Sequence, residues 1–570
     1  MNTIIAENAK VAALFAQASN ANSLGFRQYR GKNHIITWTD GIPLNQKAIV
    51  NGMDDIRFLL TDEQSAWLAI IKIAVASGDR IYIATDSRDS AFWLLSFMTR
   101  NEIHDKVTRI HVREMTVKGV RESFDNIEDI GNVMIGMTAD MLRKKTDFLL
   151  EHGTGSLIAK ACGTEAYRLG RIRTPLLEKI ADRYRQRNDI RQNSEYRVNF
   201  ALEHQGKVFR FASQESWDMP ADANQLYIRL KTSNDPVVIT KVGCNIHQEH
   251  PPRLFNMASL LQTANKRYDL TLEETVTSAQ RLYEWGLVTY PFCVADCTSF
   301  RKVHKIRQLL DILSANDTFG VYASRIGKLS QGSLCKRPSR GHHGIMITGM
   351  STGHVAHKMS YADKVTYELI CTRMIEAFSK PAVFQTVTAE AVIAGHTFLM
   401  NEEYMLHKGW KAIAERKEGK DEAVDGDQMW STGSKVHFHA VSVTKRTNGF
   451  GNLYSERELL KIATDCKLGT TTEIVNALSE LIAGSYAYRS DMGLKPTEKG
   501  LALYSVIKGQ PIADMQLMST LERNILNWKL DNMEYSHHHP GLKVYESAVS
   551  ALAESPTLFP DKDRYVLNRQ

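Results

Sequence analysis

AQRLYEWGLVTYP, residues 279–291, is the most informative segment of this 570-residue chain. Apolar residues at helical spacing, followed by Gly286, predict an amphipathic helix that ends at the glycine. Pro291 disfavours a helical backbone at the residue before it, so Tyr290 is expected to project from an extended segment. A phenol presented in this way can attack a phosphodiester and hold a nucleic acid covalently. For a lone Tyr-Pro pair, a core tyrosine beneath a turn is the simpler interpretation.

The same segment resembles the active-site helix and strand of type IA DNA topoisomerases, whose pattern reads A-Q-x-L-Y-E-x-G-L-I-T-Y-P-R-T-D-S. Tyr290 lies at the position of the family's nucleophile. The match is interrupted after Pro291, because Phe292 stands in place of the family's arginine, and Cys293 and Val294 stand in place of its Thr-Asp. The resemblance therefore implies a nucleophilic tyrosine without its usual neighbouring cation.

Composition limits the class of protein. A chain of 570 residues is too long for one hydrophobic core and predicts three or four domains. The apolar (43%) and charged (24%) fractions are ordinary, and the net charge of +7 indicates a modest preference for polyanions. The seven cysteines form no CxxC pair, so neither a zinc ribbon nor a disulfide framework is expected, and a reducing cytoplasm is the expected setting. No signal peptide or membrane-spanning run is evident.

The N-terminal region alternates strands with helices. Strands are expected at residues 3–6, 33–41 and 78–89, a pattern typical of a parallel sheet covered by helices. Glu7 directly follows the first strand, at the carboxyl edge where open α/β sheets bind ligands.

This region resembles a Toprim domain. Its first turn matches the A-E-K-P-S-x-A of topoisomerase III enzymes, with Glu7 in register, Asn8 in place of the family's lysine, and Lys10 close by.

The second acidic element of a Toprim domain reads D-x-D-x-E and binds Mg²⁺ through its oxygens. Asp86, Arg88 and Ser90 occupy the matching positions, and Asp89 is out of register. The resemblance thus implies a degraded magnesium site formed by Glu7, Asp86 and Asp89. A solvated helix start, where acids favour the positive N-terminus, is the alternative interpretation of the two aspartates.

A basic, mostly helical region is expected over residues 127–187. Its segment 168–175, RLGRIRTP, resembles the family's S-x-G-R-V-Q-T-P, whose arginine contacts the DNA backbone. Arg171 lies at that position, and Arg168 and Arg173 add further cations. Guanidinium groups match two phosphate oxygens at once, and each neutralised phosphate releases counterions, so a strand-binding role is expected. A solvated helix face is the alternative.

Two later segments also resemble family motifs. GHHGIMIT, residues 341–348, resembles H-H-A-I-I-P-T, which implies that His342 approaches the scissile phosphate, with His343 as the second candidate. Turn chemistry is the alternative interpretation of the double histidine. LGTTTEI, residues 468–474, resembles L-G-x-x-[ST]-T-R-A-x-I, so Thr472 is expected to contact phosphate.

The resemblance implies a multidomain α/β + α + β architecture: a Toprim α/β domain, a basic helical or winged-helix-like domain, a β arch that acts as a gate, and a helical domain that carries Tyr290, together forming a toroidal clamp. The expected bounds, in this order, are 1–125; 126–195 and 450–570; 196–255 and 375–449; and 256–374.

The activity implied by the resemblance is cleavage and rejoining of single-stranded DNA through a 5′-phosphotyrosine at Tyr290, which allows strand passage. Glu7 is expected to protonate the leaving oxygen. The candidates to replace the missing cations near the phosphate are Lys10, Arg88, Arg171 and His342. No GxxxxGK[ST] motif is present, so the reaction is expected to be independent of ATP.

Two alternatives remain open: a catalytically weakened clamp that only binds single-stranded DNA, and a sequence-specific, relaxase-like strand transferase of a plasmid or other mobile element. Intact Tyr290 and Glu7 favour catalysis, whereas Phe292 and the altered acidic motif favour the alternatives. The expected partners are single-stranded DNA and a helicase or the conjugation or replication machinery. The expected location is the cytoplasm, in association with the nucleoid.

Overall fold

The chain is described by a computed structural model. The described residues are 1–25, 27–39, 48–50, 56–58, 62–76, 78–84, 106–125, 127–128, 143, 146–147, 150, 169–189, 193–204, 206–233, 235–336, 343–415, 430–448 and 452–526.

The N-terminal part of the chain forms a seven-stranded sheet of order β2-β3-β4-β1-β7-β8-β9. Its elements are β1 (Asn2–Ala6), α1 (Ala9–Ser19), β2 (Asn22–Gly25), β3 (Gln28–Arg30), β4 (His34–Trp38), α2 (Asp62–Ala76), β7 (Ile81–Ala84), β8 (Val107–Ile110), α5 (Val117–Ser123) and β9 (Ile127–Glu128), beside a separate hairpin of β5 (Ala48–Val50) and β6 (Ile56–Phe58). The central strand β1 runs parallel to both of its neighbours and is buried from its second residue onward, which fits the apolar residues Ile4, Ile5 and Ala6 at its end. The strand expected at residues 3–6 is therefore confirmed. The helix expected from residue 127 is wrong at its start, because β9 pairs with β8 and extends this sheet.

A second seven-stranded sheet, of order β17-β12-β15-β16-β11-β10-β18, is antiparallel in every pair. Its elements are β10 (Asn193–His204), β11 (Lys207–Ser213), α9 (Pro220–Thr232), β12 (Val237–Glu249), β15 (Ala382–Ile393), β16 (His396–His407), β17 (Lys435–Val436) and β18 (Ala440–Asn448). Its own hydrophobic core includes the stacked rings of Phe200 and Phe211 and the indole of Trp430. In β12 only residues at the start of the strand are buried, so the rest of this strand continues as an exposed ribbon.

The remaining elements are helical. In chain order, the elements between β12 and β15 are α10 (Met257–Tyr268), α11 (Leu272–Glu284), β13 (Thr298–Ser299), the 3-10 turn η2 (Phe300–Lys302), α12 (Val303–Ser314), α13 (Gly320–Ala323), β14 (Leu334–Cys335), the 3-10 turns η4 (Thr352–His354) and η5 (Ala356–Lys358), and α14 (Tyr361–Phe378). A further short helix, α15 (Lys411–Glu415), follows β16. Helix α8 (Arg173–Asp189) packs against α17 (Thr471–Ala483), α18 (Glu498–Ile507) and the hairpin of β19 (Ala487–Ser490) and β20 (Gly493–Pro496), beside α16 (Glu456–Asp465) and α19 (Met515–Leu526). One hydrophobic core runs from β1 through α10, α11 and α14 to α19.

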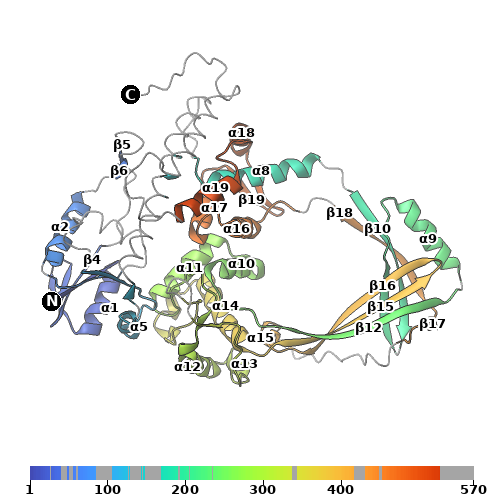
Figure 1. Cartoon of the computed structure of the whole chain (residues 1–570), viewed down its shortest axis with the longest axis horizontal. Helices are drawn as coiled ribbons and strands as arrows, with labels where there is room; N and C mark the ends of the chain where they lie inside the picture. The colour runs from blue at the N-terminus through green and yellow to red at the C-terminus, as the bar shows by residue number, and fades with distance from the viewer. Residues whose placement is uncertain are drawn as a thin grey trace, which may run out of the picture.

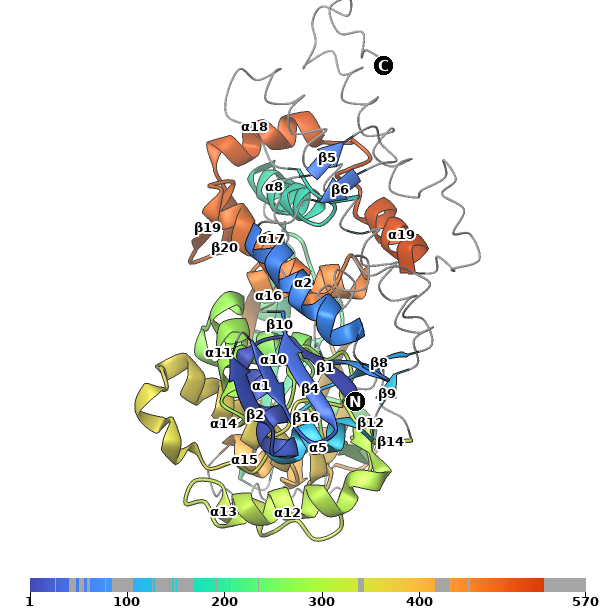
Figure 2. The same cartoon turned by 90° about the vertical axis from the view of Figure 1, so that its left-hand side faces the viewer.

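These parts form a ring around an open centre, with the second sheet opposite the N-terminal sheet (Figure 1). Both views place the N-terminal sheet beside α10, α11 and α14, with α8 and α16–α18 above them (Figure 2). Among the described helices, none is long and apolar enough to cross a membrane.

Candidate active site

Tyr290 lies on an extended segment whose backbone is held on two sides. Its N–H donates to the carbonyl of Arg113, which follows β8 of the N-terminal sheet, at 2.8 Å. The preceding residue, Thr289, donates its N–H to the carbonyl of Met346 at 2.8 Å, and its side-chain oxygen accepts from the N–H of Met346 at 3.0 Å. Helix α11 ends just before Gly286, which adopts a left-handed backbone (φ +73°). The predicted helix end and the extended tyrosine segment are thus confirmed.

The ring of Tyr290 is half-buried, so it is not enclosed in the core. It packs edge-to-face against Tyr283 and Phe292, with ring centroids 5.5 Å and 5.6 Å away. Tyr283 is itself anchored, because its hydroxyl donates to the carbonyl of Val112 at 2.6 Å. Phe292 therefore fixes the position of the phenol but supplies no charge for a phosphate.

Glu7 begins the turn between β1 and α1 and is half-buried. Its N–H donates to the carbonyl of Ala84 at 3.2 Å, and its carbonyl accepts from the hydroxyl of Thr39 at 3.0 Å. The next residue, Asn8, caps α1 by accepting hydrogen bonds from the N–H groups of Lys10 and Val11. The asparagine that replaces the family's lysine thus has a structural role at the helix start.

Lys10 lies within electrostatic reach of α11. Burial lowers the pKa of Lys10 although its side chain keeps solvent contact, and the charge of Glu284, at the end of α11, opposes that shift. The turn that carries Glu7 therefore lies on the same side of the sheet as the end of the helix that leads to Tyr290.

The expectation that Arg171 contacts DNA does not hold in this structure. Its side chain is 1% exposed, and its guanidinium donates to Asp147 at 3.0 Å, Glu473 at 2.6 Å and Glu522 at 2.9 Å. Arg143 shares Glu522, and these five residues are called the Arg171 cluster. Burial alone would lower the pKa of Arg171, but the charges of its carboxylate partners raise it. A guanidinium that is enclosed and saturated in this way has no face left for a phosphate.

Arg173 and Thr472 are also engaged in the fold. Arg173 is buried, forms an ion pair with Glu480 and donates to the carbonyl of Leu169 at 2.9 Å. Thr472 lies in the first turn of α17, where Glu473 accepts from the N-cap backbone in a capping box. A carboxylate therefore occupies the helix start at which a phosphate contact was expected.

The other expected site residues lie outside the described residues: Asp86, Arg88, Asp89, Arg168 and His342. Over the ranges that the structure does describe, no group of three or more His, Cys, Asp or Glu side chains could hold a metal ion. Of the three expected magnesium ligands only Glu7 is described, so the described residues do not form a magnesium site by themselves.

Of a set of ionisable residues around Arg113, whose carbonyl accepts the N–H of Tyr290, the sequence had singled out only His343. They come from the segment after β8, from α5, from the start of α12 and from the loop after β14: Arg113, Glu114, Glu122, Lys302, Lys305 and His343. We call this set the Arg113 cluster. Arg113 and Glu114 lie shortly after the end of β8, and no sequence motif singled them out.

His343, the neighbour of the expected histidine, is 4% exposed. Its Nδ1 lies 3.0 Å from the carbonyl of Gly344, and its Nε2 is buried and has no hydrogen-bond partner among the residues that the structure describes. Burial, followed by the charge of Lys302, lowers the pKa of His343 to about 3, so the ring is neutral near pH 7.

Cys297 and Cys335 form a disulfide between β13 and β14, with their Cα atoms 6.1 Å apart. The sequence did not predict this pair, because the two residues are 38 positions apart and share no motif. Cys293 is buried beside them, and burial raises the pKa of its thiol to about 12.

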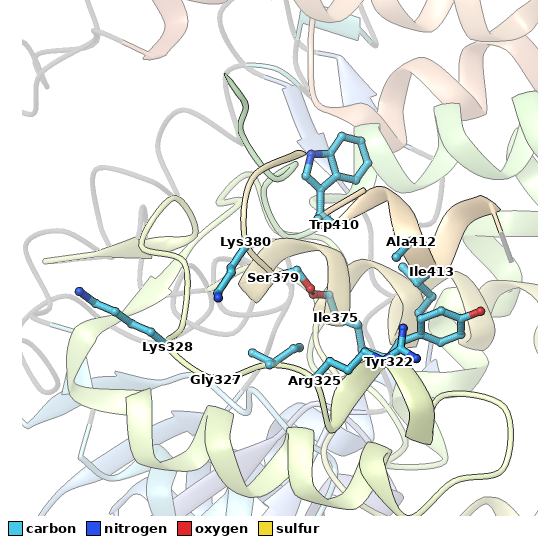
Figure 3. A pocket seen from close by; sticks show the side chains of 12 residues that line it. Tyr322, Arg325, Gly327, Lys328, Ile375, Ser379, Lys380, Trp410, Ala412 and Ile413 are labelled. Carbon is cyan, nitrogen blue, oxygen red and sulfur yellow. The ribbon is translucent and has the colours of Figure 1, made fainter. Parts of the chain in front are cut away.

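A pocket of about 170 Å³ lies among α13, the end of α14 and α15, where the second sheet joins the helical part (Figure 3). Aromatic and cationic side chains line it, among them Tyr322, Arg325, Lys328, Lys380 and Trp410. The indole of Trp410 donates to the carbonyl of Glu249 at 3.1 Å, so this ring is part of the junction.

Comparison with known proteins identifies the class. In the solved structure of full-length topoisomerase I from Thermotoga maritima, the same fold is found with a TM-score of 0.74 at 16% sequence identity, over 97% of this chain and 90% of that one. DNA topoisomerase 3 of Staphylococcus haemolyticus and of Staphylococcus aureus strain NCTC 8325 are each 22% identical over an alignment of 490 residues that covers 80% of this chain and 66% of theirs. The chain thus spans just under two thirds of the length of these relatives.

Residues 135–535 match the family model described as DNA topoisomerase. This match covers more than half of the chain, which therefore belongs to the type IA DNA topoisomerase family.

Proposed function

We propose that the protein cleaves and rejoins single-stranded DNA through a 5′-phosphotyrosine at Tyr290, and so passes one strand through another. The observation that carries this proposal is the placement of Tyr290. Its partly exposed side chain lies on a segment whose backbone is hydrogen-bonded to the loop that follows β8 of the N-terminal sheet, and the first strand of this sheet leads into Glu7. A core tyrosine beneath a turn would need no exposed face.

In the proposed reaction, the hydroxyl oxygen of Tyr290 attacks the phosphorus and forms a new P–O bond, while the bond to the 3′ oxygen breaks. The phenolic proton leaves to solvent, and Glu7 donates a proton to the departing 3′ oxygen. Rejoining reverses both transfers. Because the phosphodiester energy is kept in the phosphotyrosine, no nucleotide is required.

Mg²⁺, when bound, would neutralise charge on the phosphate. Glu7 would be one oxygen ligand, and Asp86 and Asp89 are the further candidates. The described residues do not complete this site, so no step is assigned to the metal. Chelation with EDTA tests the proposal: loss of cleavage that added Mg²⁺ restores supports a resident ion, and unchanged cleavage contradicts it.

Denaturing electrophoresis of a labelled single-stranded oligonucleotide tests the central step. Wild-type protein is expected to form a covalent adduct, and Tyr290→Phe to form none. Tyr361→Phe is the matched control, because Tyr361 is 66% exposed at the start of α14 and should leave the adduct unchanged. An adduct of undiminished yield in Tyr290→Phe would refute the assignment. Supercoil relaxation then distinguishes a topoisomerase from an enzyme that only cleaves.

A second candidate is a clamp that binds single-stranded DNA without cleaving it. Phe292 favours this candidate, because it packs on the tyrosine ring where the family has a cation. Salt-dependent binding without any adduct would identify the clamp, and an adduct confined to one sequence would identify a relaxase-like transferase.

We further propose single-stranded DNA as the partner in the cell, with a helicase or the conjugation or replication machinery, and a place in the cytoplasm beside the nucleoid. Co-purification from cells before and after nuclease treatment tests this proposal. If every co-purifying protein is lost after DNA digestion, the result supports DNA as a partner and contradicts a direct protein partner.

A further inference from the structure

Two cations of the Arg113 cluster differ from the third in their ion pairing. Within the part of the chain that the structure describes, neither Arg113 nor Lys302 forms an ion pair, and the Nε of Arg113 is buried without a hydrogen-bond partner. Both side chains are only half-buried, so each keeps an open side. Their immediate neighbour, Lys305, differs from them because it is paired with Glu114 and lies 3.7 Å from Glu122.

The charges of the cluster do not cancel. Arg113, Lys302 and Lys305 supply three cations against the two carboxylates of Glu114 and Glu122, so one positive charge is in excess. The neighbouring ring of His343 adds no charge near pH 7 because its pKa is about 3.

The surroundings of this excess charge disfavour the charged state of the two side chains. Burial lowers the pKa of Arg113, and burial with the neighbouring charges of Lys305 and Arg113 lowers the pKa of Lys302. Withdrawing a cation from water without pairing it is unfavourable, and cations of like sign repel each other. An anion placed between the two side chains would remove both penalties. Phosphate fits, because guanidinium and ammonium groups donate strongly to its oxygens.

Arg113 and Lys302 also lie close to the tyrosine segment. The carbonyl of Arg113 accepts the backbone N–H of Tyr290 at 2.8 Å, so the nucleophile and this arginine are held together by a direct hydrogen bond. Lys302 lies within electrostatic reach of Arg113. The backbone of Tyr290 is therefore hydrogen-bonded to a member of the Arg113 cluster.

We infer that Arg113 and Lys302 form the phosphate-binding site for the DNA strand that Tyr290 attacks. They supply the positive charge that Phe292 and Asn8 leave out of the family's pattern. The inference rests on the proposed function. In the transition state the non-bridging oxygens gain charge, and fixed cations that are already desolvated stabilise this charge without further reorganisation.

The test uses Arg113→Met and Lys302→Met in the full chain, with adduct formation measured in a single turnover. Each variant is expected to cleave about 100-fold more slowly, the usual effect of losing one such donor. Arg113→Lys and Lys302→Arg, which keep the charge, should recover part of the rate. Arg301→Met is the matched control, because Arg301 is exposed beside Lys302 and its loss should leave the rate unchanged.

Thermal unfolding separates this role from a structural one. Removing a half-buried cation that has no ion pair among the described residues should leave the unfolding temperature unchanged or raise it, whereas removing a structural contact would lower it. A slow variant with a lowered unfolding temperature would overturn the inference, as would wild-type cleavage in both methionine variants.

A second measurement keeps this inference distinguishable from the proposed function. If the wild type forms no adduct, the proposed function fails, and binding of a single-stranded oligonucleotide by Tyr290→Phe still reports on the phosphate site. Adding Arg113→Met or Lys302→Met to that background should weaken binding. It should also reduce the slope of log affinity against log salt concentration by about 1, the value for one lost phosphate contact. Unchanged affinity and slope would overturn the site.

Discussion

Replacing Arg171 with methionine is expected to destabilise the protein rather than weaken a contact with DNA. The guanidinium is 1% exposed and binds Asp147, Glu473 and Glu522, so the substitution leaves three carboxylates together without their shared cation. Removing one partner of a buried ion pair costs about 3–5 kcal/mol. At about 2–4 °C for each kcal/mol in a domain of ordinary size, the unfolding temperature should fall by about 6–20 °C.

Circular dichroism against temperature measures this loss, and a salt titration of single-stranded DNA binding measures the competing interpretation. Arg185→Met is the matched control, because Arg185 lies exposed on the same helix, α8, over the ring of Tyr504. It should change the unfolding free energy by no more than about 1 kcal/mol. If Arg171→Met unfolds at the wild-type temperature while the salt slope falls by about 1, the burial argument is refuted and Arg171 binds phosphate.

Three further perturbations probe the rest of the fold. In the folded protein burial raises the pKa of Glu473, but Arg171 and the helix-start hydrogen bonds outweigh it and bring the pKa to about 2, from an ordinary 4.5. The resulting stabilisation, about 3 kcal/mol relative to Glu473→Gln, should be complete above pH 4.5 and vanish as the pH falls towards 2 in acid titrations of unfolding. Gly286→Ala places a Cβ 2.8 Å from a carbonyl of the N-terminal part at φ +73°, so it should cost more unfolding free energy than Gly206→Ala, which has open space at φ +75°; equal losses would contradict the close approach. Reducing the Cys297–Cys335 disulfide opens a 38-residue loop and should lower the unfolding free energy by about 4 kcal/mol, whereas Cys297→Ser should not respond to reductant.

The local features of the site were predictable from the sequence because they depend on near neighbours. The helix before Tyr290, its end just before Gly286 and the extended tyrosine all follow from signals within a few residues. The first strand and the position of Glu7 at its carboxyl end follow in the same way from a short apolar run.

Charged residues were not predictable in this way. Arg171 lies in the basic segment 168–175, so the sequence predicted a phosphate contact for it, whereas nothing in the sequence singled out Arg113. In the structure, carboxylates distant in the chain surround Arg171, whereas Arg113 has none within ion-pair distance among the described residues.

The sequence by itself determined the order of the elements, the tyrosine segment and the membership of the family. Only the tertiary structure decided which cations are paired with carboxylates and which, near Tyr290, have no ion pair among the described residues. The physical reason is that backbone conformation depends mainly on adjacent residues, whereas the state of a charge depends on every group that folding brings within a few ångströms of it.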